Sequence, residues 1–155
     1  MPNAWTSEFN DIIRHVIFKD RILRELMMLP EDTTIIQFID KYFMRVGTSS
    51  EPLKDENVRI VYGSVGRGLA SDVHVLSQEL SFDIYVKQKQ LHNVGNDRLV
   101  YRTELIADRL NQLLCDQYDE RLGPYRFRCI GRSDMSTGTI GYVRYNISFS
   151  YMRVA

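Results

Sequence analysis

The sequence predicts an α+β fold in which a mixed or antiparallel sheet carries helices packed on one face. Two observations lead to this class: N-terminal stretches repeat apolar residues every three or four positions, and later stretches alternate apolar with polar residues. One amphipathic helix is expected between two strand pairs, which gives the order α-α-β-β-α-β-β. A length of 155 residues is typical of one domain, here residues 1–155, with a helical part over 1–46 and an α+β core over 58–155.

Two helices are predicted before the first strand. The first spans Ser7 to about Leu29, and Pro30 follows it, a common residue just beyond a helix. The second spans Thr33–Val46, with Asp32 or Thr33 as its cap, and Gly47 ends it. The expected buried side of this second helix consists of Ile35, Ile36, Ile39, Tyr42 and Phe43.

Polar segments containing glycine separate these helices from two strands. Residues 47–57 are predicted to form a loop, and Arg59–Gly63 a short strand. The segment Ser64–Ser77 reads either as a long connection or as a flexible hairpin. Glu79–Gln88 is a strand with a strict period of two. Its expected buried side consists of Leu80, Phe82, Ile84 and Val86.

The second half predicts one helix and two further strands. The helix spans Asp97 to about Asp116, capped by Asn96 or Asp97. Its apolar stripe consists of Leu99, Ile106, Leu110, Leu113 and Leu114. Tyr125–Ile130 and Gly141–Arg153 are the strands, and the glycine-bearing segment between them is expected to form a wide hairpin tip.

Composition and charge narrow the function classes. The 20 basic and 20 acidic residues balance, so there is no electrostatic reason to expect tight nucleic-acid binding. Such a balance suits a protein that packs against copies of itself. No apolar run is long enough to span a bilayer, and the first residues do not resemble a secretory signal, so a soluble protein is expected. Cys115 and Cys129 are expected to be thiols that fill apolar space.

The strongest enzymatic pattern is the stretch 61–76, which resembles the signature of the nucleotidyltransferase superfamily. Gly63, Ser64 and Asp72 match the family pattern, in which carboxylates hold two magnesium ions. His74 stands at the second carboxylate position, and imidazole is a poor magnesium ligand. The spacer before Asp72 is too short for the family's helix, and Asp83 lies closer than the family normally allows. This enzyme is the alternative from another function class.

Other site patterns are incomplete. The glycines Gly63, Gly66 and Gly68 nearly fit a dinucleotide pattern, but no amphipathic helix begins there to bind a phosphate. His15 and His92 have no second histidine or cysteine at metal-ligand spacing, and both are expected to face solvent. We therefore expect no enzymatic activity and no catalytic, cofactor-binding or metal-binding residues.

Aromatic residues suggest protein contacts instead. Nine tyrosines and seven phenylalanines are present, and many occupy alternating strand positions. Tyr85 and Tyr142 fall on the strand faces opposite their apolar neighbours, where amphipathic rings suit a protein interface. Exposed tyrosines of good β propensity explain the same pattern equally well. Arg67 and His74, in the glycine-bearing segment, are the other candidate partner contacts.

From about Val58 onward, the order of elements resembles the tail terminator (tail-completion) proteins of long-tailed bacteriophages. The resemblance rests on the strands RIVYG and LSFDIYVK, the helix RTELIADRLNQLL and the terminal strand GYVRYNISFSYMR, in that order. The segment Ser64–Ser77 departs from the family pattern.

The resemblance implies a virion protein that forms a ring, expected to be hexameric, at the head–tail junction. Such a ring ends the tail tube and joins it to the head connector, after assembly in the host cytoplasm. The implied partners are further copies of the chain, the major tail tube protein and a head-completion or connector protein. DNA would pass through the ring without specific binding, and no membrane or cofactor is involved. A head-closure (stopper) protein or another neck adaptor is the alternative within the same class.

Overall fold

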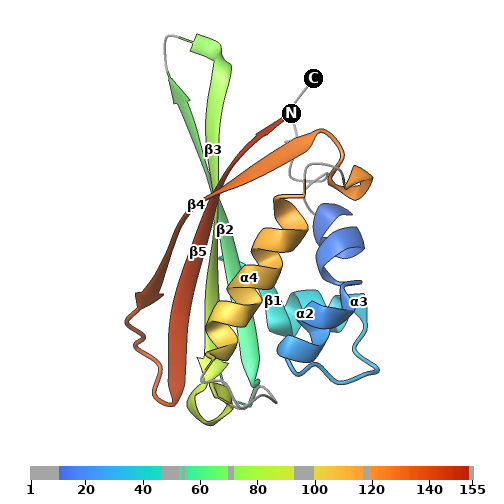
Figure 1. Ribbon diagram of the computed structural model, residues 1–155, viewed down its shortest axis with the longest axis vertical. Helices are drawn as coiled ribbons and strands as arrows, with labels where there is room; N and C mark the ends of the chain where they lie inside the picture. The colour runs from blue at the N-terminus through green and yellow to red at the C-terminus, as the bar shows by residue number, and fades with distance from the viewer. Residues whose placement is uncertain are drawn as a thin grey trace.

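In the computed structural model, five strands form one mixed sheet, and helices lie on one of its faces (Figure 1). The structure describes residues 11–46, 53, 55–69, 72–92, 100–116 and 119–153. The strand order is β1-β2-β3-β5-β4. β1 (Phe43–Arg45) runs parallel to β2 (Val58–Leu69), whereas β3 (Asp72–Lys87), β5 (Tyr142–Arg153) and β4 (Tyr125–Met135) pair antiparallel with their neighbours. The predicted α+β class is therefore confirmed, with one strand more than expected.

The first predicted helix is divided in the structure. A π-helix, η1 (Ile13–Ile17), is followed by a break and by α2 (Arg21–Leu26), while residues 7–10 lie outside the described part. Asp20 has an extended backbone, and its carboxylate accepts a hydrogen bond of 2.8 Å from the Leu23 N–H. The continuous helix over 7–29 was wrong because this side chain starts a new helix. The apolar repeat crosses the break because residues of both pieces are buried in the same core.

The second predicted helix ends earlier than expected. α3 (Ile35–Gln37) continues into a π-helix, η2 (Phe38–Tyr42), and the chain then becomes β1. Thr34, rather than Asp32 or Thr33, caps α3 by exchanging hydrogen bonds with Gln37. Ile36 is 69% exposed instead of buried. Phe43 is not helical because its backbone pairs with β2. Its ring stacks on that of Phe38, with the two ring centroids 5.3 Å apart.

The segment Ser64–Ser77 consists mainly of strand. β2 and β3 remain paired from Val58↔Val86 to Arg67↔Ser77, and the register shifts after Gly68. Of the two sequence alternatives, the backbone adopts the hairpin, and its far end projects beyond the helices (Figure 1). The strand was not predicted from the sequence because Gly66 and Gly68 lower the β propensity of this segment, although they do not prevent pairing.

The helix α4 (Arg102–Leu114) covers β3, β5 and β4. It begins later than predicted, after Tyr101, which makes no side-chain cap; the predicted caps and Leu99 lie outside the described residues. Ile106, Leu110 and Leu113 are buried as predicted, at 0%, 0% and 6% exposure. Each such side chain contributes about 1.5–3 kcal/mol of transfer free energy.

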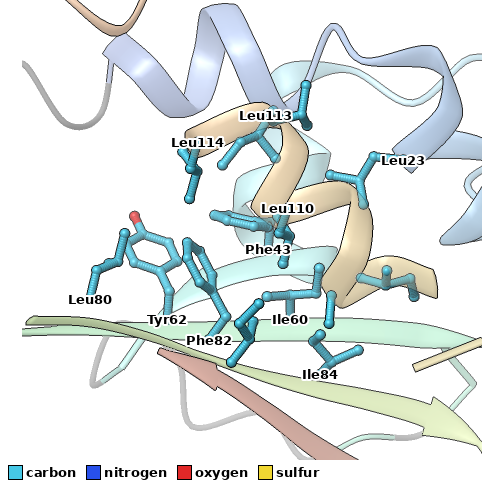
Figure 2. Close-up of a cluster of buried hydrophobic side chains, with 14 of the residues drawn as sticks. Leu23, Phe43, Ile60, Tyr62, Leu80, Phe82, Ile84, Leu110, Leu113 and Leu114 are labelled. Atoms are coloured by element: carbon cyan, nitrogen blue, oxygen red, sulfur yellow. The ribbon is translucent and has the colours of Figure 1, made fainter. Parts of the chain in front are cut away.

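One hydrophobic core joins the N-terminal part to the later α+β part. Figure 2 shows α4 side chains meeting the inner face of the sheet, with Leu23 and Phe43 packed against them. The core residues that the sheet contributes in this view are Ile60, Tyr62, Leu80, Phe82 and Ile84. The two parts of the predicted single domain, 1–46 and 58–155, share this core, and the part over 1–46 also contains β1.

The terminal hairpin is longer than predicted. β4 continues through Gly131–Met135, which sequence analysis had assigned to the tip, and residues 136–141 connect it to β5. Two short 3-10 helices, η3 (Gln88–Gln90) and η4 (Glu120–Leu122), follow β3 and precede β4. Cys115 and Cys129 are free, half-buried thiols, and burial raises the pKa of Cys115, opposed by a backbone hydrogen bond from Cys129.

Candidate assembly surface

The sheet face opposite α4 carries a row of polar side chains. They alternate along β3 and β5 with the core residues, as the period of two requires. The row consists of Ser81, Asp83, Tyr85, Arg144, Asn146 and Ser148, all half-buried. We call this row the polar face. It is a surface on which a partner would meet hydrogen-bonding groups rather than apolar side chains.

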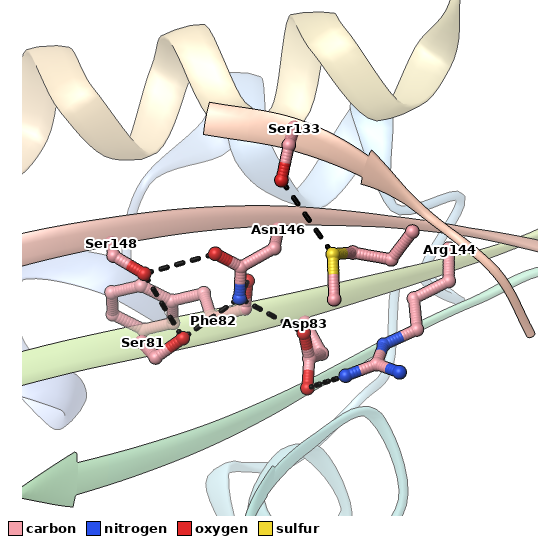
Figure 3. Close-up of polar contacts among 8 residues, drawn as sticks. Ser81, Phe82, Asp83, Ser133, Arg144, Asn146 and Ser148 are labelled. Atoms are coloured by element: carbon pink, nitrogen blue, oxygen red, sulfur yellow. Dashed lines mark hydrogen bonds and ion pairs between the residues drawn. The ribbon is translucent and has the colours of Figure 1, made fainter. Parts of the chain in front are cut away.

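Hydrogen bonds within β5 and between β3 and β5 fix the polar face (Figure 3). Asn146 Nδ2 donates to Ser81 Oγ at 2.7 Å and to Asp83 Oδ1 at 3.0 Å. Ser148 Oγ donates to Asn146 Oδ1 at 2.9 Å, and Arg144 Nη2 donates to Asp83 Oδ2 at 2.8 Å. Because each side chain is held by a neighbour, little rotamer entropy remains to be lost when a partner binds.

Two of the predicted contact residues lie on β3 and β5, and only one of them, Tyr85, belongs to the polar face. Tyr85 is half-buried, with the Arg144 guanidinium 5.8 Å from its ring centroid. Tyr142 is only 6% exposed, and its hydroxyl donates to the Glu56 carbonyl at 2.7 Å. Burial raises the pKa of Tyr142, and the Glu56 carboxylate adds to the effect. Of the two rings, Tyr85 offers the more accessible surface.

The other two predicted contacts lie away from this row. Arg67 is in β2 and His74 in β3, both in the projecting hairpin, and their side chains lie outside the described part. Of the four predicted residues, one therefore belongs to the polar face, one is buried at the start of β5, and two lie in the projecting hairpin. His15 and His92, expected to face solvent, are exposed.

Sequence analysis missed the exposed half of β4. Every residue from Ile130 to Met135 is exposed, although the strand alternates normally before Cys129. Ile130 and Met135 are 50% and 40% exposed, and Ile140 in the following turn is fully exposed. We call Ile130–Met135 the open edge. Met135 and Ile140, isolated apolar residues in a glycine-bearing segment, were the available signal, but that segment was assigned to the hairpin tip.

One arginine holds the open edge in place. Arg132 pairs with Asp108 of α4, and its Nη2 donates to the Glu104 carbonyl at 3.2 Å. Its Nε donates to the Tyr145 hydroxyl at 3.1 Å. Because these contacts hold the Arg132 guanidinium in one position, they also restrict the backbone of Arg132. The open edge is therefore held as a strand although it is exposed.

The residues of the nucleotidyltransferase pattern do not come together. Gly63 and Ser64 lie inside β2, which continues as strand to Leu69, where the family has a helix. Asp72 and Asp83 occupy one strand, and at about 3.3 Å per residue their separation is roughly 30 Å or more. Two magnesium ions a few ångströms apart could not use both carboxylates. Within the described residues, no group of three or more His, Cys, Asp or Glu is placed to hold a metal ion.

Two open hollows lie on the helical side. One, of about 280 Å³, is lined by α2 and the residues around it, including Lys19, Arg24 and Glu31. The other, of about 210 Å³, lies between His15 and Pro124. In the part of the chain described, no helix combines the length and apolar character needed to cross a membrane.

Comparison with known proteins places the chain in a family. No curated protein matches it. The family model that matches is that of YomW, over residues 10–151, a range that extends from before η1 into β5. The match therefore includes α4, the polar face and the open edge. The chain belongs to the YomW family, a phage-derived, SPbeta-prophage-like family, and is a phage-associated protein.

Proposed function

We propose that the chain is a structural protein of the phage head–tail junction, a tail terminator that forms a ring, expected to be hexameric. The ring would end the tail tube and present a surface to the head connector. The observation that carries this proposal is the open edge, a strand exposed on both faces and held by α4 through Arg132. Exposed strand edges of this kind pair readily with other chains.

The polar face supports the same function. Its hydrogen-bonded row offers donors and acceptors that are fixed in position before a partner binds. Contacts of this type give an interface specificity for one partner and one orientation.

The arrangement of helix and sheet favours a terminator over a stopper. The resemblance to tail terminators includes a helix between two strand pairs, and α4 occupies this place between β3 and β4. A stopper would instead be expected to be mostly a β barrel. Here the sheet is open, with β1 and β4 at its two ends.

Tail tubes assembled from the major tail tube protein of the same phage provide the test. When the purified chain is added during assembly, electron microscopy should show a ring at one end of each tube, and tube length should stop increasing. Ile130→Asp should abolish this activity, because it places a charge on the open edge. Ile22→Asp, at a residue with 51% exposure on α2, is the matched control and should retain it.

Two other results would count against the terminator proposal. Tubes that continue to grow and carry no additional density at either end would contradict the terminator proposal. A thermal stabilisation by magnesium with ATP would favour the nucleotidyltransferase alternative, since a ligand that binds only the folded state raises its stability.

A further inference from the structure

We infer that copies of the chain join through two different strand edges: the open edge of β4 in one copy pairs antiparallel with the outer half of β2 in the next. This inference rests on the proposed ring and specifies its subunit contact. It follows from the direction of the backbone groups along β4 and along the outer half of β2, which the pairing of the strands determines.

The hydrogen-bond alternation fixes which groups of β4 point outward. Gln88 N–H donates to the Gly141 carbonyl, so in β5 the odd-numbered residues bond to β3 and the even-numbered residues face β4. In the exposed half of β4, the residues that pair with these even-numbered residues of β5 are Gly131, Ser133 and Met135. The N–H and C=O groups of Arg132 and Asp134 therefore point away from the sheet.

The backbone groups of β2 alternate in the same way. Lys87 N–H donates to the Asn57 carbonyl, so Arg59, Val61 and every second residue after them bond to β3. Ile60 and Tyr62 face the other way, where β1 pairs with them, and Val46 N–H bonds to the Tyr62 carbonyl. Beyond this point, Ser64, Gly66 and Gly68 direct their backbone groups outward, and no described strand pairs with them.

The two edges match each other. Ser64–Leu69 and Ile130–Met135 have equal lengths. Ser64–Leu69 is on the side of the sheet where β1 lies, beyond the residues that β1 pairs with, and Ile130–Met135 is on the opposite side. β4 runs antiparallel to β2, because three antiparallel pairings separate them. If the next copy continues the sheet in the same orientation, β4 meets β2 as an antiparallel pair, the more stable ladder.

A second copy is therefore the partner that the edges fit. Contact between two different edges is heterologous, and such a contact closes into a ring when the rotation between copies permits. Pairing of β4 with β4 would instead be isologous and would stop at a dimer. The edges thus provide the head-to-tail contact that a ring of identical subunits requires.

Proline substitutions test each edge separately. Asp134→Pro removes an outward N–H and leaves the β4–β5 ladder intact, and Ser64→Pro does the same on β2. Asp134→Thr and Ser64→Thr keep the N–H and serve as matched controls. Circular dichroism and a single cooperative melt would establish that each variant folds, and native mass spectrometry would measure the number of subunits.

The wild type and both threonine variants should form a ring, and each proline variant alone should be a monomer. An equimolar mixture of the two proline variants should give a dimer and nothing larger, because one intact edge remains on each chain. Rings from either proline variant, a dimer of Ser64→Pro alone, or a monomeric wild type would overturn the edge pairing. If tubes are still capped in those cases, the proposed function stands and only this contact is wrong.

Discussion

At the residue scale, the Asp20 side chain makes two separate stabilising contacts. Its carboxylate caps α2 through the Leu23 N–H and also pairs with Arg109 of α4, whose Nε donates at 2.9 Å. Burial raises the pKa of Asp20, but the hydrogen bonds from Arg109 and Leu23 and the charges of Arg109 and Arg121 together hold it below its usual value. The ionised form is therefore the one that stabilises the contact between α2 and α4.

The lowered pKa of Asp20 predicts that the stability of the fold depends on pH. Because the folded-state pKa is depressed, the contribution is present above the unfolded-state pKa, about 3.9 for Asp, and is lost as pH falls through the folded-state value. Asp20→Asn should keep the cap, cost about 1 kcal/mol at neutral pH and flatten the acid limb. Asp20→Ala should cost about 2–3 kcal/mol, since the cap is lost as well. Urea unfolding at several pH values measures both; an unchanged acid limb in Asp20→Asn would contradict this account.

At the scale of elements, α4 holds the inner face of the sheet together. Leu110 is fully buried and lies between Leu23, Phe43 and the sheet (Figure 2). The start of the helix is held by Arg102, whose Nη1 donates to the Leu26 carbonyl at 2.7 Å and whose Nε donates to the Gln90 carbonyl at 2.9 Å. Loss of packing under α4 should therefore loosen the N-terminal helices and the sheet together.

Leu110→Ala should lower the free energy of unfolding by about 2–5 kcal/mol, because it leaves a cavity in the core. Gln112→Ala, at an exposed position of the same helix, is the control and should change stability by about 0.5 kcal/mol or less. Chemical denaturation monitored by circular dichroism compares the two. Equal stabilities for these variants would mean that α4 does not pack as described.

Elements with strong periodicity could be predicted from the sequence, and short elements could not. The alternation in Glu79–Gln88 and the leucine stripe of α4 each identify a buried face, because repeated burial leaves a repeated pattern. β1 has three residues, and its Phe43 continues the helical spacing of the residues before it. The choice between helix and strand there depends on pairing with β2, a contact that no local pattern records.

At the scale of the whole molecule, the candidate surface was the least predictable part. Which residues alternate along β3 and β5 follows from the sequence, but the register that places Asp83 opposite Asn146 joins positions far apart in the chain. The open edge depends on the strand order, which places β4 at an end of the sheet. Sequence analysis identified the polar side of Tyr85 but not the strand edge on which the ring proposal rests.

We propose that the chain completes the phage tail at its junction with the head. Electron microscopy of lysates from the phage with this gene deleted tests the proposal, with the wild-type gene supplied in trans as the control. The deletion should give DNA-filled heads separate from tails and tails of uncontrolled length, and the wild-type gene should restore normal virions. Normal virions from the deletion would contradict it.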